Sequence, residues 1–201
     1  LLDHFAVLKG IAVRSERKEL VAALLKQTNL YDVRKKNLGT FSGGMKQRFG
    51  IAQALIGNQK LIIVDEPTAG LDPAERNRFH NLLSEIGENV IIILSTHIVD
   101  DVTDLCSNMA IINKGEVLLT GQPKKLIEGL SGKVWMKEVE KPEVAAYRAQ
   151  FNVISARMHT GLVVLHVNSN SAPDPSFVSV QPNLEDVYFA AITNHLSPAV
   201  V

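Results

Sequence analysis

The chain has 201 residues, of which 46% are hydrophobic and 21% are charged, which excludes a disordered protein and leaves room for one or two domains with a core. Lysine plus arginine number 21, as do aspartate plus glutamate, so no net positive field argues for nucleic acid or an anionic membrane surface as a partner. No apolar run approaches the ~20 residues that span a bilayer, and we expect no segment to cross a membrane.

The remaining whole-chain features concern location. The single cysteine, Cys106, cannot form an internal disulfide, which agrees with a reducing cytoplasm. The start, "LLDHFAVLKG", has neither a basic region nor a cleavage-like site, so we expect no signal peptide. Because the first residue is Leu1 and not methionine, we expect the chain to be a piece of something longer.

Residues 1–56 have the pattern of helices. Apolar residues recur at helical spacing in Leu2, Phe5 and Leu8, and again between Leu20 and Leu30. A further helix is predicted in "TFSGGMKQRFGIAQAL", residues 40–55, and no strand signal interrupts this part of the chain. We therefore predict a helical subdomain at residues 1–56.

Residues 57–122 alternate short apolar runs with helices. Strands are predicted in "LIIV" (61–64), "VIIIL" (90–94), "MAIIN" and "EVLLTG", and helices at about residues 74–86 and 99–106. Unbroken runs of this kind between helices are typical of strands buried on both faces of a parallel sheet. The fold class that we predict is α/β.

The pattern changes in residues 123–201. "KVWMKEV" and "LVVLHV" alternate apolar and polar residues around the helix-like "PEVAAYRAQF", and a turn-rich loop precedes "FVSVQPNLEDVYFAAI". Alternation indicates a sheet with one face in water. We predict a small α+β appendage.

Two carboxylates, Asp65 and Glu66, follow the "LIIV" strand. Open α/β sheets bind their ligands at the carboxyl ends of their strands, where Asp65 could hold Mg²⁺ and Glu66 could orient a nucleophilic water. The alternative is an ordinary polar transition from strand to loop, closed by Pro67. The acid pair alone does not decide between these interpretations.

Two further polar residues lie near this edge in the predicted fold. Asp72 lies in the turn "TAGLDP", and His97 in "STH" follows the next strand. Singly, Asp72 reads as the N-cap of the helix beginning at Pro73, and His97 as an ordinary polar residue. Together with Asp65 and Glu66 they predict an edge where a phosphoryl group could be sensed and attacked. Asp100 and Asp101 fit the first turn of the following helix, and we do not interpret them as metal ligands.

The stretch "FSGGM" predicts a helix start that binds phosphate. Unpaired amides and the helix dipole make this end positive, and glycines let a phosphate approach closely. Ser42 adds a hydroxyl group, and Lys46 and Arg48 are expected to add nearby positive charge. The alternative is a loop with two flexible glycines and a serine cap.

"FSGGMKQR", "LIIVDEP", "AGLD" and "STH", in this order and spacing, resemble the second half of an ATP-binding cassette (ABC) ATPase. The resemblance implies a P-loop NTPase-like (RecA-like) core. It assigns residues 61–66 to the Walker B motif, residues 69–72 to the D-loop and His97 to the switch histidine. The signature motif would comprise Ser42, Gly43, Gly44 and Met45, where many members carry glutamine in place of Met45. The end, "VQPNLEDVYFAAI", resembles subunits that pair with ABC-2-type exporter permeases.

The resemblance also implies a mechanism. Two nucleotide-binding domains meet head to tail, and the signature motif of one serves ATP held by the other. Asp65 would contribute to Mg²⁺ binding, Glu66 would polarise the attacking water and His97 would contact the γ-phosphate, while Asp72 couples the two sites. A separate permease would hold the subunit at the cytoplasmic face of the membrane.

The sequence departs from the family in one large respect, because it contains no G-x-x-x-x-G-K-[ST]. The nearest match, "GLSGKV" at residues 129–134, has its glycines three apart and ends in Val134. We therefore expect a subunit lacking its N-terminal Walker A and Q-loop part, inactive alone and with apolar surface open where strands are missing. The alternatives are a non-transport ABC ATPase and a non-catalytic cassette fragment.

Overall fold

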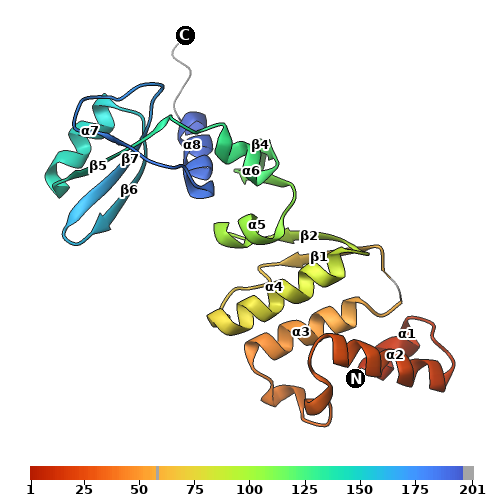
Figure 1. Cartoon of the computed structure of the whole chain (residues 1–201). Coiled ribbons are helices and arrows are strands. Elements are labelled where there is room, and N and C mark those ends of the chain that lie inside the picture. The colour runs from red at the N-terminus through yellow and green to blue at the C-terminus, as the bar shows by residue number, and fades with distance from the viewer. Residues whose placement is uncertain (58, 197–201) are drawn as a thin grey trace. The chain divides into compact units, whose positions relative to one another are not determined.

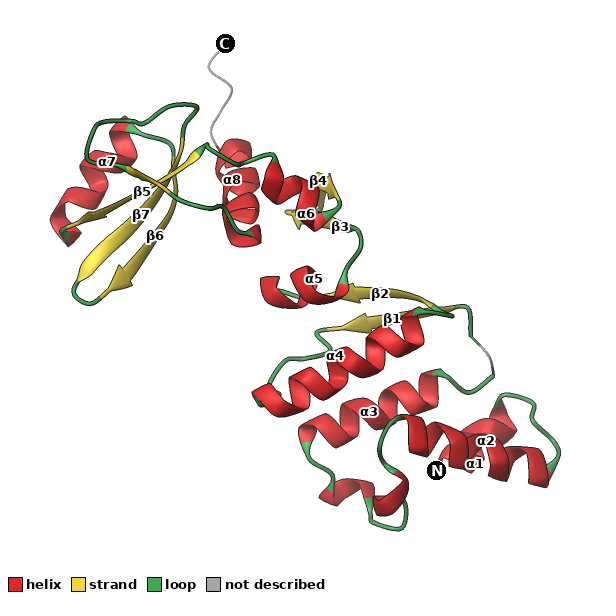
Figure 2. Ribbon diagram, in the orientation of Figure 1, coloured by secondary structure: helices red, strands yellow, loops and turns green. Residues whose placement is uncertain are grey.

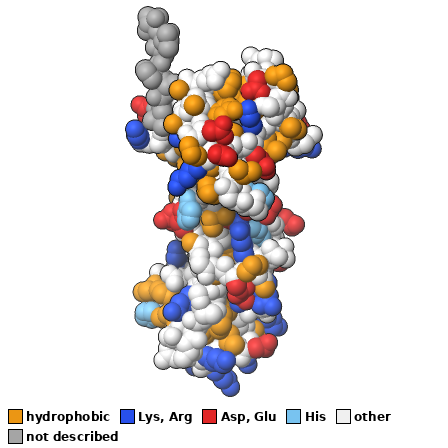
Figure 3. All heavy atoms as spheres, turned by 90° about the vertical axis from the view of Figure 1, so that its left-hand side faces the viewer, with side chains coloured by type: hydrophobic (Ala, Val, Ile, Leu, Met, Phe, Trp, Pro, Cys, Tyr) orange, Lys and Arg blue, Asp and Glu red, His pale blue; other side chains and the backbone are white. Residues whose placement is uncertain are grey.

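The computed structural model describes residues 1–57 and 59–196, and no helix within them is long and apolar enough to span a bilayer. The chain divides into two compact units, Leu1–Asp101 and Val102–Val201 (Figure 1). The three-part division at residues 56 and 122 stays a prediction. On the face seen in Figure 3, acidic and basic side chains are interspersed among hydrophobic ones.

The first unit begins with helices, as predicted, and no strand precedes Leu61 among its described residues. These elements are α1 (Leu2–Leu8), α2 (Arg14–Gln27), the 3-10 turns η1 (Tyr31–Val33) and η2 (Leu38–Thr40), and α3 (Gly43–Ala54). Their apolar faces meet in one buried cluster, comprising Leu2, Ala6, Leu24, Leu25, Leu30, Phe41, Ala52 and Ile56. Burial of each large aliphatic side chain in this cluster contributes about 1.5 to 3 kcal/mol, which stabilises the packing of α3 against α1 and α2.

Two parallel strands follow, β1 (Leu61–Asp65) and β2 (Ile91–Ser95), connected through α4 (Pro73–Gly87). Their register pairs Asp65 with Ser95, so both strands end at one edge of the sheet. Helix α4 begins where Asp72 caps it and Pro73 supplies a preset φ angle. The α/β class is confirmed, and the strand ends lie where the predicted site requires them.

The prediction that these strands are buried on both faces is wrong for β1 and β2. Ile62 is buried and Ile92 packs beside Gly87 at the end of α4. The opposite face carries four exposed side chains: Leu61 (47% exposed), Ile63 (70%), Ile91 (67%) and Ile93 (51%). A two-stranded sheet with a helix on one side leaves its other side in water, which confirms the expected open apolar surface.

The second unit starts in the last residues of α5 (Val99–Leu105) and continues with a hairpin of β3 (Met109–Asn113) and β4 (Glu116–Gly121). The expectation of parallel strands is wrong here, because a two-residue loop can connect only antiparallel neighbours. Lys114 and Gly115 form that loop with φ angles of +49° and +85°, the signature of a type I′ turn.

The rest of the second unit is the α+β appendage (Figure 2), as predicted. Its antiparallel sheet has the strand order β6-β7-β5-β8. The elements are α6 (Pro123–Glu128), β5 (Val134–Val139), η3 (Lys141–Glu143), α7 (Val144–Gln150), β6 (Val153–His159), β7 (Leu162–Asn168), β8 (Val178–Ser179) and α8 (Leu184–Leu196).

The prediction of one face in water is wrong, because helices cover both faces of this sheet. Val163 and Leu165 of β7 pack beside Tyr147 of α7 on one face. On the other face Val134 packs beside Ala190 of α8, and His166 Nδ1 lies 2.7 Å from Oδ1 of Asp186. The sequence analysis did not identify β6, whose last three residues are all exposed.

Candidate functional site

The predicted acids and the imidazole meet at the carboxyl ends of β1 and β2. Asp65 accepts a hydrogen bond from the Ser95 hydroxyl group of the neighbouring strand. The carboxylate of Glu66 contacts His97 twice: Oε2 lies 2.8 Å from Nδ1, and Oε1 accepts the His97 backbone N–H at 3.2 Å. This edge therefore brings together Asp65, Glu66 and His97, the three groups expected there.

The backbone at Glu66 is held in an unusual conformation. Its φ angle is +46°, a left-handed value that disfavours residues with a Cβ by about 1 to 2 kcal/mol. Two hydrogen bonds stabilise it: the Glu66 N–H donates to the Ser95 carbonyl at 2.8 Å, and the Ala69 N–H donates to the Glu66 carbonyl at 3.3 Å. The Glu66 side chain is 36% exposed, although its Oε2 is shielded from solvent, and the His97 side chain is 75% exposed, so a ligand can approach the pair from the His97 side.

The start of α3 has the geometry of a capped helix. Ser42 is its N-cap, and the Ser42 hydroxyl oxygen accepts the Met45 N–H at 3.2 Å. Ser42 and Gly43 are exposed, and a Cβ placed on Gly43 would meet nothing within 4 Å. The cap that we considered as an alternative is present and occupies the Met45 N–H, while the exposed Gly43 at the start of the helix stays accessible to an anion.

Gly44 and Arg48 make contacts with α4 that the sequence did not indicate. A Cβ on Gly44 would lie 2.6 Å from Oε2 of Glu75, so this glycine lets α3 approach α4. Arg48 is 6% exposed, and its Nη2 lies 3.0 Å from the same Glu75 oxygen. The expectation that Arg48 supplies charge at the helix start is wrong, because its guanidinium is buried in this ion pair. Lys46, by contrast, is exposed.

Asp72 caps α4, since its Oδ1 accepts the Glu75 N–H at 2.9 Å. The same Glu75 binds Arg48 in the middle of α3, so this glutamate connects the capped start of α4 with the body of α3. In the described part of the chain, none of the hydrogen bonds or ion pairs joins residues 42–45 to Asp65, Glu66 or His97. The predicted site residues thus form two groups within the first unit.

Sequence analysis missed the role of Asp101, which lies in the first turn of α5 and is fully buried. Its carboxylate accepts hydrogen bonds from Thr68, Arg76 and His80. Burial alone raises the pKa of Asp101, but these hydrogen bonds and the charge of Arg76 outweigh burial and hold the pKa below its usual range. Nothing in the sequence of residues 68–80 indicates that Thr68, Arg76 and His80 all bind the same carboxylate.

A preformed metal cage is absent from the described residues, which contain no group of three or more His, Cys, Asp or Glu side chains placed to hold an ion. Mg²⁺ commonly binds through one or two carboxylates together with substrate phosphates, so a lone Asp65 at the edge fits a nucleotide-bound ion.

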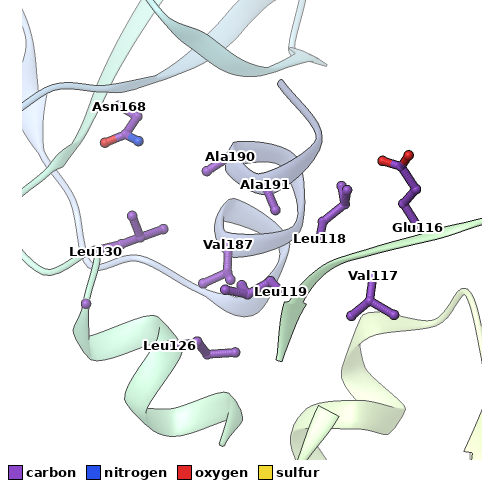
Figure 4. A pocket seen from close by; sticks show the side chains of 11 residues that line it. Glu116, Val117, Leu118, Leu119, Leu126, Leu130, Asn168, Val187, Ala190 and Ala191 are labelled. Carbon is purple, nitrogen blue, oxygen red and sulfur yellow. The ribbon is translucent and has the colours of Figure 1, made fainter. Parts of the chain in front are cut away.

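An apolar pocket of about 650 Å³ lies in the second unit and is lined mainly by β4, α6 and α8 (Figure 4). Its walls are formed largely by leucine, valine and alanine, with Glu116 and Asn168 as the polar members. None of the predicted site residues lines it, so the chemistry predicted above belongs to the first unit.

Comparisons with known proteins agree with this geometry. Residues 2–69 match the family described as "ABC transporter". ABC transporter A family member 8 of Dictyostelium discoideum is 41% identical over 148 residues, which cover 71% of this chain and 18% of that protein. The uncharacterised ABC transporter ATP-binding protein YdbJ of Bacillus subtilis (strain 168) is 32% identical over 212 residues, covering 96% of this chain and 66% of the relative.

Among solved structures, an ATP-binding cassette of an ABC transporter in its ADP conformation has a TM-score of 0.51 and 24% identity, covering 56% of this chain and 44% of that one. This likeness supports the P-loop NTPase fold of the chain. The chain spans less than a quarter of the Dictyostelium protein and 66% of the Bacillus one. From its motifs, their geometry and these relatives, the chain belongs to the family of ABC transporter ATPases.

Proposed function

We propose that this chain forms part of a nucleotide-binding domain that couples ATP binding and hydrolysis to transport through a separate membrane permease. The observation that carries the proposal is the Glu66–His97 pair, with 2.8 Å between Oε2 and Nδ1, beside Asp65 at the carboxyl ends of two parallel strands. Acid and imidazole groups at such an edge suit phosphoryl transfer to water.

Three side chains share the work on this side of the site. Glu66 polarises the attacking water, since its carboxylate is a hydrogen-bond acceptor that is partly open to solvent. Asp65 binds Mg²⁺, which neutralises charge on the phosphates of the substrate. His97 contacts the γ-phosphate, and the 2.8 Å contact of its Nδ1 with Oε2 of Glu66 holds the imidazole beside the carboxylate.

The signature residues serve a nucleotide held by a second nucleotide-binding domain. Ser42 and Gly43 are exposed at the positive end of a 12-residue helix, while Gly44 and Met45 continue its first turn. Asp72 lies at the start of α4 and transmits changes between the two sites of the dimer. Residues 42–45 share no hydrogen bond with Glu66, which supports the proposal that the two groups act on different nucleotides.

The partners follow from this arrangement. A second nucleotide-binding domain completes each ATP site, and a permease carries the transport pathway and holds the subunit at the cytoplasmic face of the membrane. The tail "VQPNLEDVYFAAI" supports a permease of the ABC-2 exporter class. In the structure, Asn183 and Asp186 of this tail form a reciprocal capping pair at the start of α8, with N–H to side-chain oxygen distances of 2.9 and 3.0 Å.

We expect the 201-residue chain by itself neither to bind MgATP tightly nor to hydrolyse it. Residues 1–201 contain no G-x-x-x-x-G-K-[ST], whose amides and lysine would provide most of the phosphate donors. Isothermal titration with MgATP tests this expectation, and tight binding would show that another segment supplies the phosphate cradle.

The hydrolytic assignment is tested in a chimera that places a segment with a strand and a G-x-x-x-x-G-K-[ST] loop before Leu1. Glu66→Gln should lower kcat at least about 100-fold, the scale of a general-base loss, while MgATP binding persists. Glu88→Gln is the matched control, because Glu88 is an exposed glutamate at the far end of α4. Equal turnover in the two variants would refute the role of Glu66.

A further inference from the structure

Asp101 is a buried carboxylate whose two oxygens bind different parts of the first unit. Its Oδ1 accepts from two residues of α4: Arg76, with Nε at 2.8 Å, and His80, with Nε2 at 2.8 Å. Its Oδ2 accepts from two hydroxyl groups: that of Thr68, in the loop after β1, and that of Thr96, in the loop after β2, whose Oγ1 lies 3.5 Å away. One side chain therefore connects a helix with the loops after both strands.

Two of these donors lie on either side of Asp72 in the sequence, so their bonds to Asp101 hold the loop that contains Asp72 at both ends. Thr68 lies four residues before Asp72 and Arg76 lies four residues after it, and both bind the Asp101 carboxylate. Within this loop, the Leu71 N–H donates to the Thr68 carbonyl at 3.2 Å, and Asp72 caps α4. The backbone around Asp72 is thus anchored on both sides to one buried group.

The Asp101 carboxylate also holds the turn that contains His97. Thr96 immediately precedes His97, and Asp101 itself lies four residues after it. The Thr96 hydroxyl oxygen also accepts the Ile98 N–H at 3.0 Å, so the turn that carries His97 is bound at both ends. A buried polar group with several donors fixes its neighbours because no alternative partner is available from water.

We propose that Asp101 is a positioning residue that holds the loop of Asp72 and the loop of His97 in register with Glu66, so that both loops move as one element. The proposal rests on the proposed function for what Asp72 and His97 do to nucleotide. The geometry that it describes needs no nucleotide, so it can fail or hold independently of the hydrolytic assignment.

Amide hydrogen exchange of the 201-residue chain, followed residue by residue by NMR, tests the proposal. The reporters are the amides of Leu71 and His97, whose acceptors are the Thr68 carbonyl and Glu66 Oε1. Asp101→Asn should speed exchange at both reporters about ten-fold, the size expected when a hydrogen bond that holds a loop is lost.

Two isosteric variants test separately the contact of Asp101 with the loop of Asp72, made by Thr68, and its contact with the loop of His97, made by Thr96. Thr68→Val removes the hydroxyl group of the first loop and should speed exchange at Leu71 while leaving His97 within two-fold, and Thr96→Val should do the reverse. Because each valine variant keeps the buried carboxylate with its α4 partners, both remain informative if Asp101→Asn does not fold.

Leu83→Ala is the control for a general loss of stability, because Leu83 is a buried apolar residue of α4, 3% exposed, whose side chain has no hydrogen-bonding group to bind either loop. It should speed exchange in α4 and leave both reporters unchanged. Faster exchange at Leu71 alone in Thr68→Val, and at His97 alone in Thr96→Val, would support the proposal. Unchanged reporters in those variants, or equal acceleration in Leu83→Ala, would overturn it.

Discussion

Replacing Gly44 by alanine should destabilise the first unit, whereas the same change at the adjacent Gly43 should not. A new Cβ on Gly44 would lie 2.6 Å from Oε2 and 3.3 Å from Cβ of Glu75, whose carboxylate is held by Arg48 at 3.0 Å. Moving Glu75 away would break an ion pair in which Arg48 is 7% and Glu75 is 18% exposed.

The size of the effect follows from two opposing contributions. Alanine gains up to about 1 kcal/mol over glycine within a helix, but overpacking a close contact costs about 1 to 3 kcal/mol. Because Gly44 is only the second residue of α3, the gain there is small, and we expect Gly44→Ala to lose about 1 to 3 kcal/mol, with about 2 kcal/mol as the central value. Gly43→Ala, with open space around it, should be neutral or slightly stabilising. The difference of about 2 kcal/mol corresponds to a shift of about 1 M in the urea midpoint.

Urea unfolding followed by circular dichroism at 222 nm is the appropriate assay. The only tryptophan, Trp135, lies on β5 in the second unit, so its fluorescence would not report on α3. Equal midpoints for Gly43→Ala and Gly44→Ala would refute the argument that Gly44 is required by the close approach of α3 and α4.

Three further predictions concern the cap, the open sheet face and acid stability. Ser42→Ala should cost about 1 kcal/mol through loss of the cap on the Met45 N–H, and Ser42→Asn should restore it in the same urea assay; no cost would argue against the cap. Ile63→Lys should reduce self-association in light scattering with a stability change within about 0.5 kcal/mol, because Ile63 is 70% exposed; unchanged association would exclude this face as the sticky surface. Because the folded-state pKa of Asp101 is lowered from its ordinary 3.8, its contribution to stability is present above that value and is lost as pH falls through the lower folded-state value. Asp101→Asn should therefore be less stable at neutral pH and show a weaker acid dependence between pH 5 and pH 2 in circular dichroism, and an unchanged acid profile would contradict the assignment.

Local patterns were sufficient to predict the parts of the fold that depend on sequence neighbours. The apolar runs before Asp65 and Ser95 became parallel strands, and Asp72 with Pro73 predicted the start of α4 to within a residue. These signals are local because a strand, a cap and a turn each depend on a few adjacent residues. The convergence of Glu66 and His97 followed from the rule that parallel strands end at one edge.

Features that depend on distant partners could not be predicted in this way. Arg48 was expected at the phosphate end of α3, but its partner Glu75 lies 27 residues further along the chain and buries it. Asp101 was interpreted as a residue of a helical first turn, although three of its donors come from residues 68–80. Burial of β1 on both faces was inferred from its apolar sequence, which cannot reveal which neighbours the sheet has.

The claim that Ser42 of one chain serves the ATP site of another can be tested most directly by mixing two inactive variants of the ATP-hydrolysing chimera. Glu66→Gln removes the hydrolytic group, and Ser42→Arg blocks the helix start. In a head-to-tail dimer of the two variants, one site carries both changes and the other carries neither. An equimolar mixture should therefore recover about a quarter of the unmodified turnover, since half of the dimers are mixed and each has one intact site. Turnover no higher than that of either variant alone would contradict the account.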